Sequence, residues 1–128
     1  MDFPTEYAPV LSLALSPHFT DDGILFAGTE SHGLFYSDDG GVSWMRRNGK
    51  KITESVNAVV LSPLYPDKPD VLVAHGNRLL VSRDGGKSWT DWRENGEVGT
   101  VVSVAAPCGL DRDARLLVGL LDKGVVKI

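Results

Sequence analysis

Residues 37–44 read Ser-Asp-Asp-Gly-Gly-Val-Ser-Trp, and residues 82–89 read Ser-Arg-Asp-Gly-Gly-Lys-Ser-Trp. Serine, aspartate, two glycines, a second serine and tryptophan recur in the same order. The offset, from Ser37 to Ser82, is 45 residues. A repeat of this period is typical of a chain that is built from copies of one supersecondary unit.

The segments around the two octapeptides repeat with nearly the same period, and each has a third copy. These apolar runs are 11–17, 57–63 and 101–107; 24–28, 70–74 and 115–119; and 33–36, 78–81 and 124–127. The runs are aliphatic or β-branched and end at Gly, Pro, Asp or Asn, which is typical of strands. None keeps a 3.6-residue period long enough to predict a helix.

The repeats therefore predict an all-β chain. We expect strands at 10–16, 24–29, 33–37 and 43–47; at 56–62, 70–75, 78–82 and 88–93; and at 100–106, 115–121 and 124–128. Four antiparallel strands in 40–50 residues are the signature of a β-propeller blade. The prediction is a partial propeller of about three blades. The innermost strand of each blade is almost fully apolar, so we expect it to be buried on both faces.

The predicted organisation is a single domain with an N-terminal strand or clasp at 1–9, blade 1 at 10–54, blade 2 at 55–98 and an incomplete blade 3 at 99–128. Propellers close with four to eight blades, so three blades leave two apolar faces free. We expect assembly into a six-bladed ring, most simply a homodimer, in which residues 3–8 supply the missing outer strand of blade 3. Blades from another polypeptide, blades from a longer chain, or an open stack are the alternatives.

Composition excludes several classes of protein. The chain has 128 residues, a net charge of −4 and 42% hydrophobic residues, which favours a folded globular protein over a disordered one. The acidic balance disfavours nucleic-acid binding, and no apolar run is long enough for a membrane helix. A single cysteine, Cys108, excludes an intrachain disulfide and a CxxC zinc site. The N-terminus lacks the features of a signal peptide, which favours a cytoplasmic location.

The pattern Ser-x-Asp-x-Gly-x-x-Trp resembles the Asp-box, or BNR repeat, of sialidases, sortilin-type receptors and bacterial propellers. The resemblance covers residues 10 to 128 and implies a turn at the blade periphery, away from any active centre. The expected roles are structural: the aspartates accept backbone hydrogen bonds, the glycines adopt positive φ and the tryptophans cover the turn. The residues concerned are Ser37, Asp39, Gly41, Trp44, Ser82, Asp84, Gly86 and Trp89.

Catalytic sialidases of this family carry an arginine trio, a Tyr–Glu nucleophile pair and an Arg-Ile-Pro motif. Arg-Ile-Pro is absent here, so no catalytic residue is assigned and the prediction leans away from an enzyme. His18, His32 and His75 are too scattered to predict a metal site, and no cofactor is expected. Trp92 lies outside the motif, and we expect it to pack at the outer edge of blade 2 rather than add to a contact surface.

The leading functional hypothesis is a non-enzymatic binding or scaffold module whose propeller face takes a protein, peptide or glycan. The resemblance implies that this face carries the loops between second and third strands and the connections between blades, including 48–51 and 95–97. The candidate residues are Glu30, His32, Lys50, His75, Arg78, Asp122 and Lys123. The alternatives are a sialidase-like or glycoside-hydrolase-like protein that is complete only on assembly, and a purely structural propeller fragment.

Overall fold

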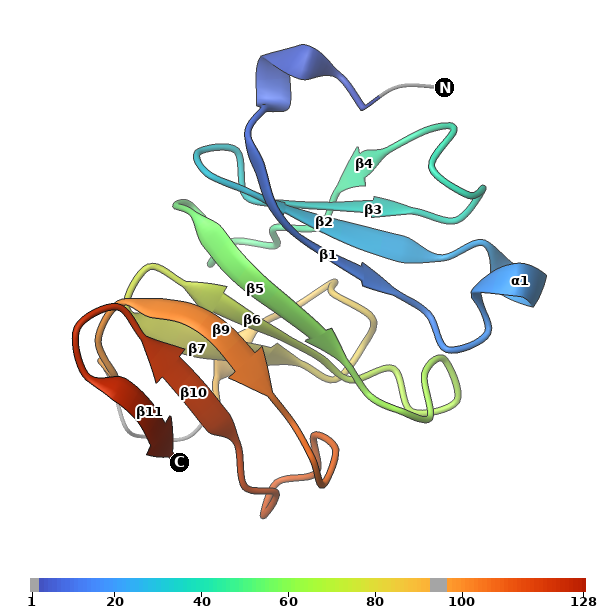
Figure 1. The fold of residues 1–128 in the computed structure, drawn as a ribbon. Coiled ribbons are helices and arrows are strands. Elements are labelled where there is room, and N and C mark those ends of the chain that lie inside the picture. Colours follow the sequence, from blue (N-terminus) through green and yellow to red (C-terminus); the bar gives the residue numbers. More distant parts are fainter. Residues whose placement is uncertain (1–2, 93–96) are drawn as a thin grey trace.

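A computed structural model describes residues 3–92 and 97–128, which fold as an arc of three β-sheets (Figure 1). In chain order the elements are η1 (Thr5–Tyr7), β1 (Val10–Leu15), α1 (Phe19–Asp22), β2 (Leu25–Thr29), β3 (Leu34–Ser37), β4 (Met45–Arg46), β5 (Val56–Leu61), β6 (Val71–His75), β7 (Arg78–Ser82), β8 (Thr90–Asp91), β9 (Val101–Ala105), β10 (Leu117–Leu120) and β11 (Gly124–Lys127).

The sheets have the strand orders β1-β2-β3-β4, β5-β6-β7-β8 and β9-β10-β11, and every pairing is antiparallel. β1, β5 and β9 lie side by side and run in the same direction, and the other strands of each sheet fan outward from them (Figure 1). This is the arrangement of three propeller blades around an axis. The predicted all-β partial propeller is confirmed, and each described strand lies within its predicted range.

The outer strands β4 and β8 are only two residues long. The predicted ranges, 43–47 and 88–93, were longer because the sequence does not show how far each turn extends. In the structure residues 43–44 and 88–89 still belong to the turn. Residue 93 lies outside the described residues, as do residues 95 and 96 of the predicted blade connection.

The core lies between blades rather than inside any one of them. One cluster joins blades 1 and 2, and another joins blades 2 and 3. The first contains Phe26, Leu34, Tyr36, Ile52, Val56, Val59, Tyr65, Val71, Val73, Leu80 and Trp89. The second contains Ala58, Leu72, Ala74, Leu79, Val81, Trp92, Val101, Leu110, Ala114, Leu116, Val118 and Leu120.

Burial of the inner strands differs from the prediction. β5 is largely buried, but Leu11, Leu13 and Leu15 of β1 are 44%, 61% and 52% exposed. β9 is likewise exposed along much of its length. β5 has a blade on each side, whereas β1 and β9 have a blade on one side only. Apolar sequence alone does not show that difference.

Each inner strand carries a β-bulge at its second residue. The register of β1 on β2 shifts between Val10 and Ser12, and the same shift occurs in the other two blades. The bulge residues are Leu11, Asn57 and Val102. In blade 2 the bulge turns the Asn57 side chain toward blade 3, where its Nδ2 donates a hydrogen bond to the backbone oxygen of Val101 at 2.8 Å. The bulge therefore links neighbouring blades.

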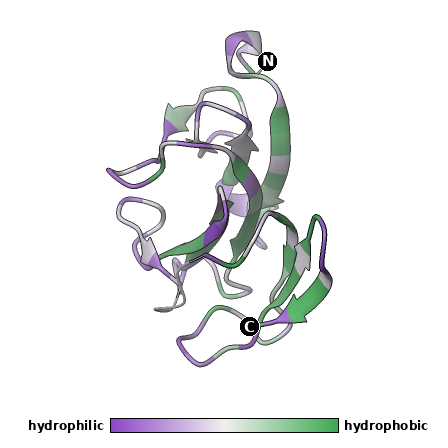
Figure 2. Cartoon of the chain, turned by 90° about the vertical axis from the view of Figure 1, so that its left-hand side faces the viewer, coloured by the Kyte–Doolittle hydropathy of each residue, from purple (hydrophilic) through white to green (hydrophobic). Residues whose placement is uncertain are grey.

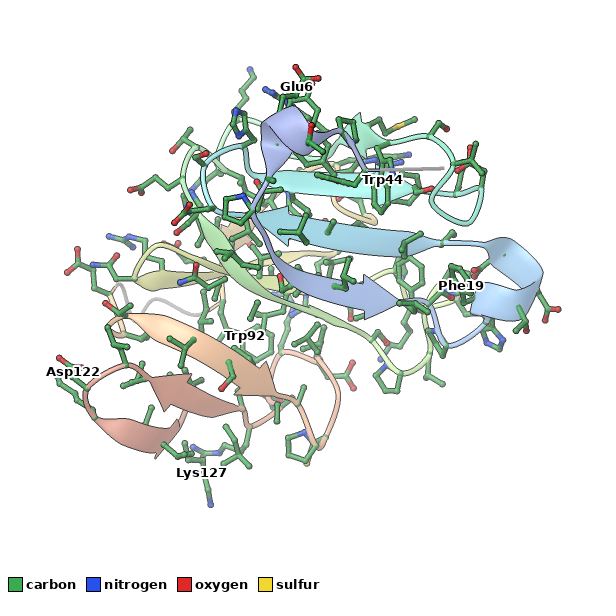
Figure 3. The ribbon with its side chains drawn as sticks, turned by 45° about the horizontal axis from the view of Figure 1, so that its top comes forward. Glu6, Phe19, Trp44, Trp92, Asp122 and Lys127 are labelled. Carbon is green, nitrogen blue, oxygen red and sulfur yellow. The ribbon has the colours of Figure 1, made fainter. Side chains whose placement is uncertain are left out.

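The N-terminal segment differs from the predicted strand. Of its described residues, Thr5–Tyr7 form a 3₁₀ helix that lies on the outer part of blade 1 (Figures 1 and 3). The rings of Phe3 and Tyr7 lie 5.5 and 4.7 Å from that of Phe35, and Phe3 also lies 5.1 Å from Trp44. Two aromatic rings four residues apart meet on one side of the turn, and they bury Phe35 to 2% exposure.

Two smaller expectations also change. The segment between β1 and β2, for which the repeats predict no helix, forms the one-turn helix α1, which Gly23 ends at φ 64°. Trp92 does not lie at the outer edge of blade 2. It is buried, 7% exposed, between the second sheet and blade 3 (Figure 3). Among the described residues no helix is long and apolar enough to cross a membrane.

Candidate binding face

The loops that follow β2, β6 and β10 lie at one edge of the three-blade arc. The pairings of Val10 with Thr29, Val56 with His75 and Val101 with Leu120 place the end of each second strand beside the start of each inner strand. The blade connections reach the inner strands at this same edge. The predicted functional loops are therefore neighbours, and the turns after β3 and β7 lie at the opposite edge.

A cleft at this edge has a volume of about 530 Å³. It lies where the connection from blade 1 meets the β6–β7 hairpin and β8. Two cations, three carboxylates, an amide and an imidazole surround it, so it is strongly polar. The lining residues are Lys51, Glu54, His75, Asn77, Arg78, Leu80, Asp91 and Glu97.

An ion pair forms part of the cleft wall. Arg78 begins β7 and Asp91 ends β8, and their side chains approach to 3.5 Å between Nη1 and Oδ2. Both side chains remain accessible, at 43% and 40% exposure. A pair this exposed contributes little to stability, so both groups are available to a ligand.

His75 holds the floor of the cleft. It is 7% exposed, and its Nε2 accepts hydrogen bonds from the backbone N–H groups of Thr53 and Glu54, both at 3.0 Å. An acceptor nitrogen carries no proton, so the ring is neutral with its proton on Nδ1. Burial lowers the pKa of His75, and the nearby Glu54 carboxylate opposes that shift. His75 therefore positions the blade connection.

A second cleft of about 300 Å³ lies beside the β2–β3 loop of blade 1. His32 and Arg46 line it together with Asn48, whose Oδ1 accepts a hydrogen bond from the Leu34 backbone N–H at 2.8 Å. The His32 ring also lies 5.3 Å from that of Tyr7, so the N-terminal segment borders this edge.

The structure divides the predicted binding residues. His75 and Arg78 line the larger cleft and His32 lines the smaller one. Glu30, Lys50, Asp122 and Lys123 are exposed and line neither of these two clefts. Asp122 projects from the β10–β11 turn at the far end of the arc (Figure 3).

Sequence reasoning missed several cleft residues, including Glu54 and Asp91. Asp91 follows Trp89 by two residues on the outer strand, and its partner across the sheet is Leu80. Because side chains two residues apart in a strand lie on the same face, this spacing indicated that Asp91 lies on the same face as Trp89. Glu54 had no such signal, because the path of the connection from blade 1 depends on His75.

The two Ser-x-Asp-x-Gly-x-x-Trp turns have one hydrogen-bond pattern. Asp39 Oδ1 accepts hydrogen bonds from the backbone N–H groups of Val42 at 3.0 Å and Ser43 at 2.9 Å, and from Ser37 Oγ at 2.8 Å. Ser43 Oγ donates to Asp39 Oδ2 at 2.5 Å. Asp84 accepts the equivalent four hydrogen bonds in blade 2. The hydrogen bonds that each carboxylate accepts come from its own turn.

Electrostatics agrees with a structural role for both aspartates. The side-chain hydroxyl of Ser43 and its backbone N–H lower the pKa of Asp39 to about 2. Burial raises the pKa of Asp84, but hydrogen bonds from Ser82 and Ser88 outweigh it and lower that pKa to about 2. Both carboxylates are thus ionised and fully engaged, unlike a general acid, which needs a proton near neutral pH.

The tryptophans of the two turns differ in how they are held. Trp44 Nε1 donates to the Gly41 backbone oxygen at 3.0 Å. Trp89 Nε1 donates to Gly86 O at 3.1 Å and also to Arg47 O of the preceding blade at 3.0 Å. Trp89 therefore joins blade 2 to blade 1, whereas the ring of Trp44 faces the N-terminal segment.

No group of three or more His, Cys, Asp or Glu side chains is placed to hold a metal ion within residues 3–92 and 97–128. Cys108 is a free, exposed thiol. The histidines singled out in the sequence lie in separate places, with His18 before α1, His32 in the β2–β3 loop and His75 at the end of β6.

No protein-family model matches the chain, and no curated protein matches it. The solved structures that are similar in fold include two GH74 enzymes. An ancestral GH74 enzyme matches 87% of this chain with a TM-score of 0.68 at 20% sequence identity. The Niastella koreensis GH74 enzyme matches 95% of it with a TM-score of 0.52 at 16% identity. The chain spans only 13% and 24% of the lengths of those proteins.

Proposed function

We propose that this chain is a non-enzymatic binding module of Asp-box propeller blades, and that the 530 Å³ cleft takes a polar peptide segment of a protein partner. The cleft itself carries the proposal, because it lies at the edge where the predicted binding loops meet. Its described lining offers cations and carboxylates side by side, and no Phe, Tyr or Trp ring. Such a lining favours a ligand with both signs of charge over an apolar one.

Arg78 and Asp91 are the residues we expect to contact the peptide. Both side chains are partly exposed. Arg78 can therefore bind a ligand carboxylate in place of Asp91, and Asp91 can bind a ligand cation in place of Arg78. The buried ring of His75 fixes the backbone of residues 53–54 and hence the position of the Glu54 side chain. In this reading His75 is a positioning residue and does not touch the ligand.

The test is isothermal titration calorimetry with three probes: a mixed-charge peptide, the neutral sugar cellotetraose and the acidic sugar sialyllactose. We expect the peptide to bind, and Arg78→Ala to weaken that binding roughly tenfold through the loss of a charge-assisted hydrogen bond. Lys123→Ala is the matched control, because it removes a cation from the same edge outside the cleft. Equal effects of the two variants, or binding of no probe, would overturn the proposal.

A glycoside hydrolase is the second candidate. The observation that favours it is the similarity in fold to GH74 enzymes, which are glycoside hydrolases. Glycoside hydrolysis ordinarily needs two carboxyl groups on either side of one bond. Glu54 and Glu97 both line the cleft and are the residues to test for this chemistry. Release of reducing sugar from a soluble polysaccharide, lost in both Glu54→Gln and Glu97→Gln, would favour the enzyme over the binding module.

A further inference from the structure

The two ends of the arc expose opposite halves of an interface that the chain already makes twice. Blade 1 packs on blade 2 and blade 2 on blade 3, always with equivalent faces in contact. The free face of blade 1 exposes Leu13 and Leu15, at 61% and 52%. The free face of blade 3 exposes Leu117 and Val125, at 39% and 72%. Figure 2 shows hydrophobic residues along both end blades.

The positions of these residues in the sheets show which side of the interblade interface each free face corresponds to. Leu13 pairs with Ala27 as Val59 pairs with Val73, and the latter two lie in the core between blades 1 and 2. The free face of blade 1 is therefore equivalent to the face of blade 2 that packs on blade 1.

Leu117 and Val125 correspond to Leu72 and Leu79, which lie in the core between blades 2 and 3. The free face of blade 3 is therefore equivalent to the face of blade 2 that packs on blade 3. The two free faces are complementary halves of one interface.

The inner strands give a more specific match. Val10, Val56 and Val101 begin the three inner strands. Val56 is 0% exposed and packs on Gly28 of blade 1, where an added Cβ would lie 2.6 Å from Val56 O and 2.7 Å from Val56 Cγ1. At the equivalent position blade 2 has Ala74, against the buried Val101.

In blade 3 the equivalent of Gly28 is Gly119. It is paired with Ser103 as Gly28 is paired with Ser12. An added Cβ on Gly119 would meet the Ser103 side chain and nothing else closer than 3.7 Å. Val10, 37% exposed, is the corresponding free valine at the other end of the arc. Within the described residues, Gly119 therefore offers space for a valine from another blade, and Val10 is a valine that packs on no such glycine.

The N-terminal segment indicates how large the blade is that docks on blade 1. On blade 2, Trp89 contacts Arg47, which continues the fourth strand of the preceding blade. On blade 1, the equivalent Trp44 contacts Phe3. Phe3 thus occupies the place of a preceding fourth strand. A four-stranded blade would collide with it, whereas the three-stranded sheet of β9, β10 and β11 leaves that place free.

We infer that the occupant is a second copy of this chain. Blade 3 of each copy docks on blade 1 of the other, Val10 of one copy packs on Gly119 of its partner, and the two arcs close a ring of six blades. Two copies of these three blades give six, which lies within the four to eight blades of closed propellers. The interface is head-to-tail and closed by a twofold axis.

The test is solution mass by light scattering after size exclusion, at about 100 μM where even a modest affinity is visible. We expect a mass near twice 13.8 kDa. Gly119→Val should raise the dimer dissociation constant roughly tenfold or more, because its methyl groups fill the site for Val10. In the single chain the Cβ of that valine meets the movable Ser103 side chain, and valine suits a strand. The monomer should therefore keep its circular dichroism and melting temperature.

Leu13→Asp on the free face of blade 1 should give the same loss of dimer. The matched control is Leu64→Asp, which places a charge on an equally exposed leucine, 58% accessible, away from both faces. Should either interface variant fail to fold, hydrogen exchange of the wild type at high and low concentration gives the answer, since only assembly protects both β1 and β11. A monomer throughout, an open-ended series of larger masses, or a dimer that Gly119→Val and Leu13→Asp leave unchanged would overturn the inference.

Discussion

Gly28→Ala tests how rigidly blade 1 is packed on blade 2. A Cβ at this position would lie 2.5 Å from Ser12 Oγ, 2.6 Å from Val56 O and 2.7 Å from Val56 Cγ1. Ser12 can rotate its side chain, but the Val56 backbone is paired with His75 and fully buried. Inner strand β5 must therefore move away from blade 1.

Overpacking of this kind costs about 1–3 kcal/mol. Alanine recovers about 0.5–1 kcal/mol by restricting the unfolded chain. The net loss is then centred on about 1 kcal/mol and is at most about 2.5 kcal/mol, or about 4–9 °C in Tm for a domain of this size. Gly119→Ala is the matched control, because its Cβ meets the equivalent Ser103 side chain but no neighbouring blade. We expect a change within about 0.5 kcal/mol there.

Both substitutions are made in a chain that also carries Leu13→Asp, so that contact between chains does not contribute. Urea unfolding followed by tryptophan fluorescence gives the two free energies of unfolding. If Gly28→Ala and Gly119→Ala cost the same, the backbone of Val56 yields freely and the reasoning from the interblade contact is wrong.

Three further predictions concern the turns and the buried histidine. Because the pKa values of Asp39 and Asp84 are lowered to about 2, their contribution is complete above the unfolded pKa near 4 and is lost as pH falls toward 2. The Tm of the double variant Asp39→Asn, Asp84→Asn should therefore depend less on pH than that of the wild type when Tm is measured between pH 5 and pH 2. Trp89→Phe should cost more stability than Trp44→Phe in urea unfolding, by about 1 kcal/mol, because it removes two hydrogen bonds rather than one. The pKa of His75 is lowered by burial, so its neutral form favours folding above about pH 6.5 and this contribution falls as pH drops below that value. NMR titration of the ring should give a midpoint below 6.5, and a midpoint above it would contradict the hydrogen bonds to Nε2.

The blade repeat was readable in the sequence because its turn is made by local contacts. Ser37, Asp39 and Trp44 act within eight residues of one another, and so their spacing alone predicts the hairpin. The strands on either side follow from their apolar composition and from the second copy at Ser82–Trp89.

The remaining features depend on contacts between distant segments. The rings of Phe3 and Tyr7 gave no sign that they would cover Phe35, because that contact requires blade 1 to be in place. His75 looked like a loop residue of a binding face, and only the pairing of β5 with β6 shows that it holds residues 53–54. For the same reason the sequence predicts which loops share an edge, but it does not identify the carboxylates that line the cleft there.

The Ser-x-Asp-x-Gly-x-x-Trp turn has a consequence for how such chains arise. The hydrogen bonds that the Asp39 carboxylate accepts come from residues 37–43, and the Gly40 backbone N–H ties the turn to its own blade through the Gly23 backbone oxygen at 2.9 Å. A duplicated blade repeat therefore brings its own turn. It also brings an inner-strand valine and a packing face that match those of the blade from which it was copied. Gain or loss of a whole blade is therefore a small evolutionary step in this architecture, because each blade carries its turn together with the segment that anchors it.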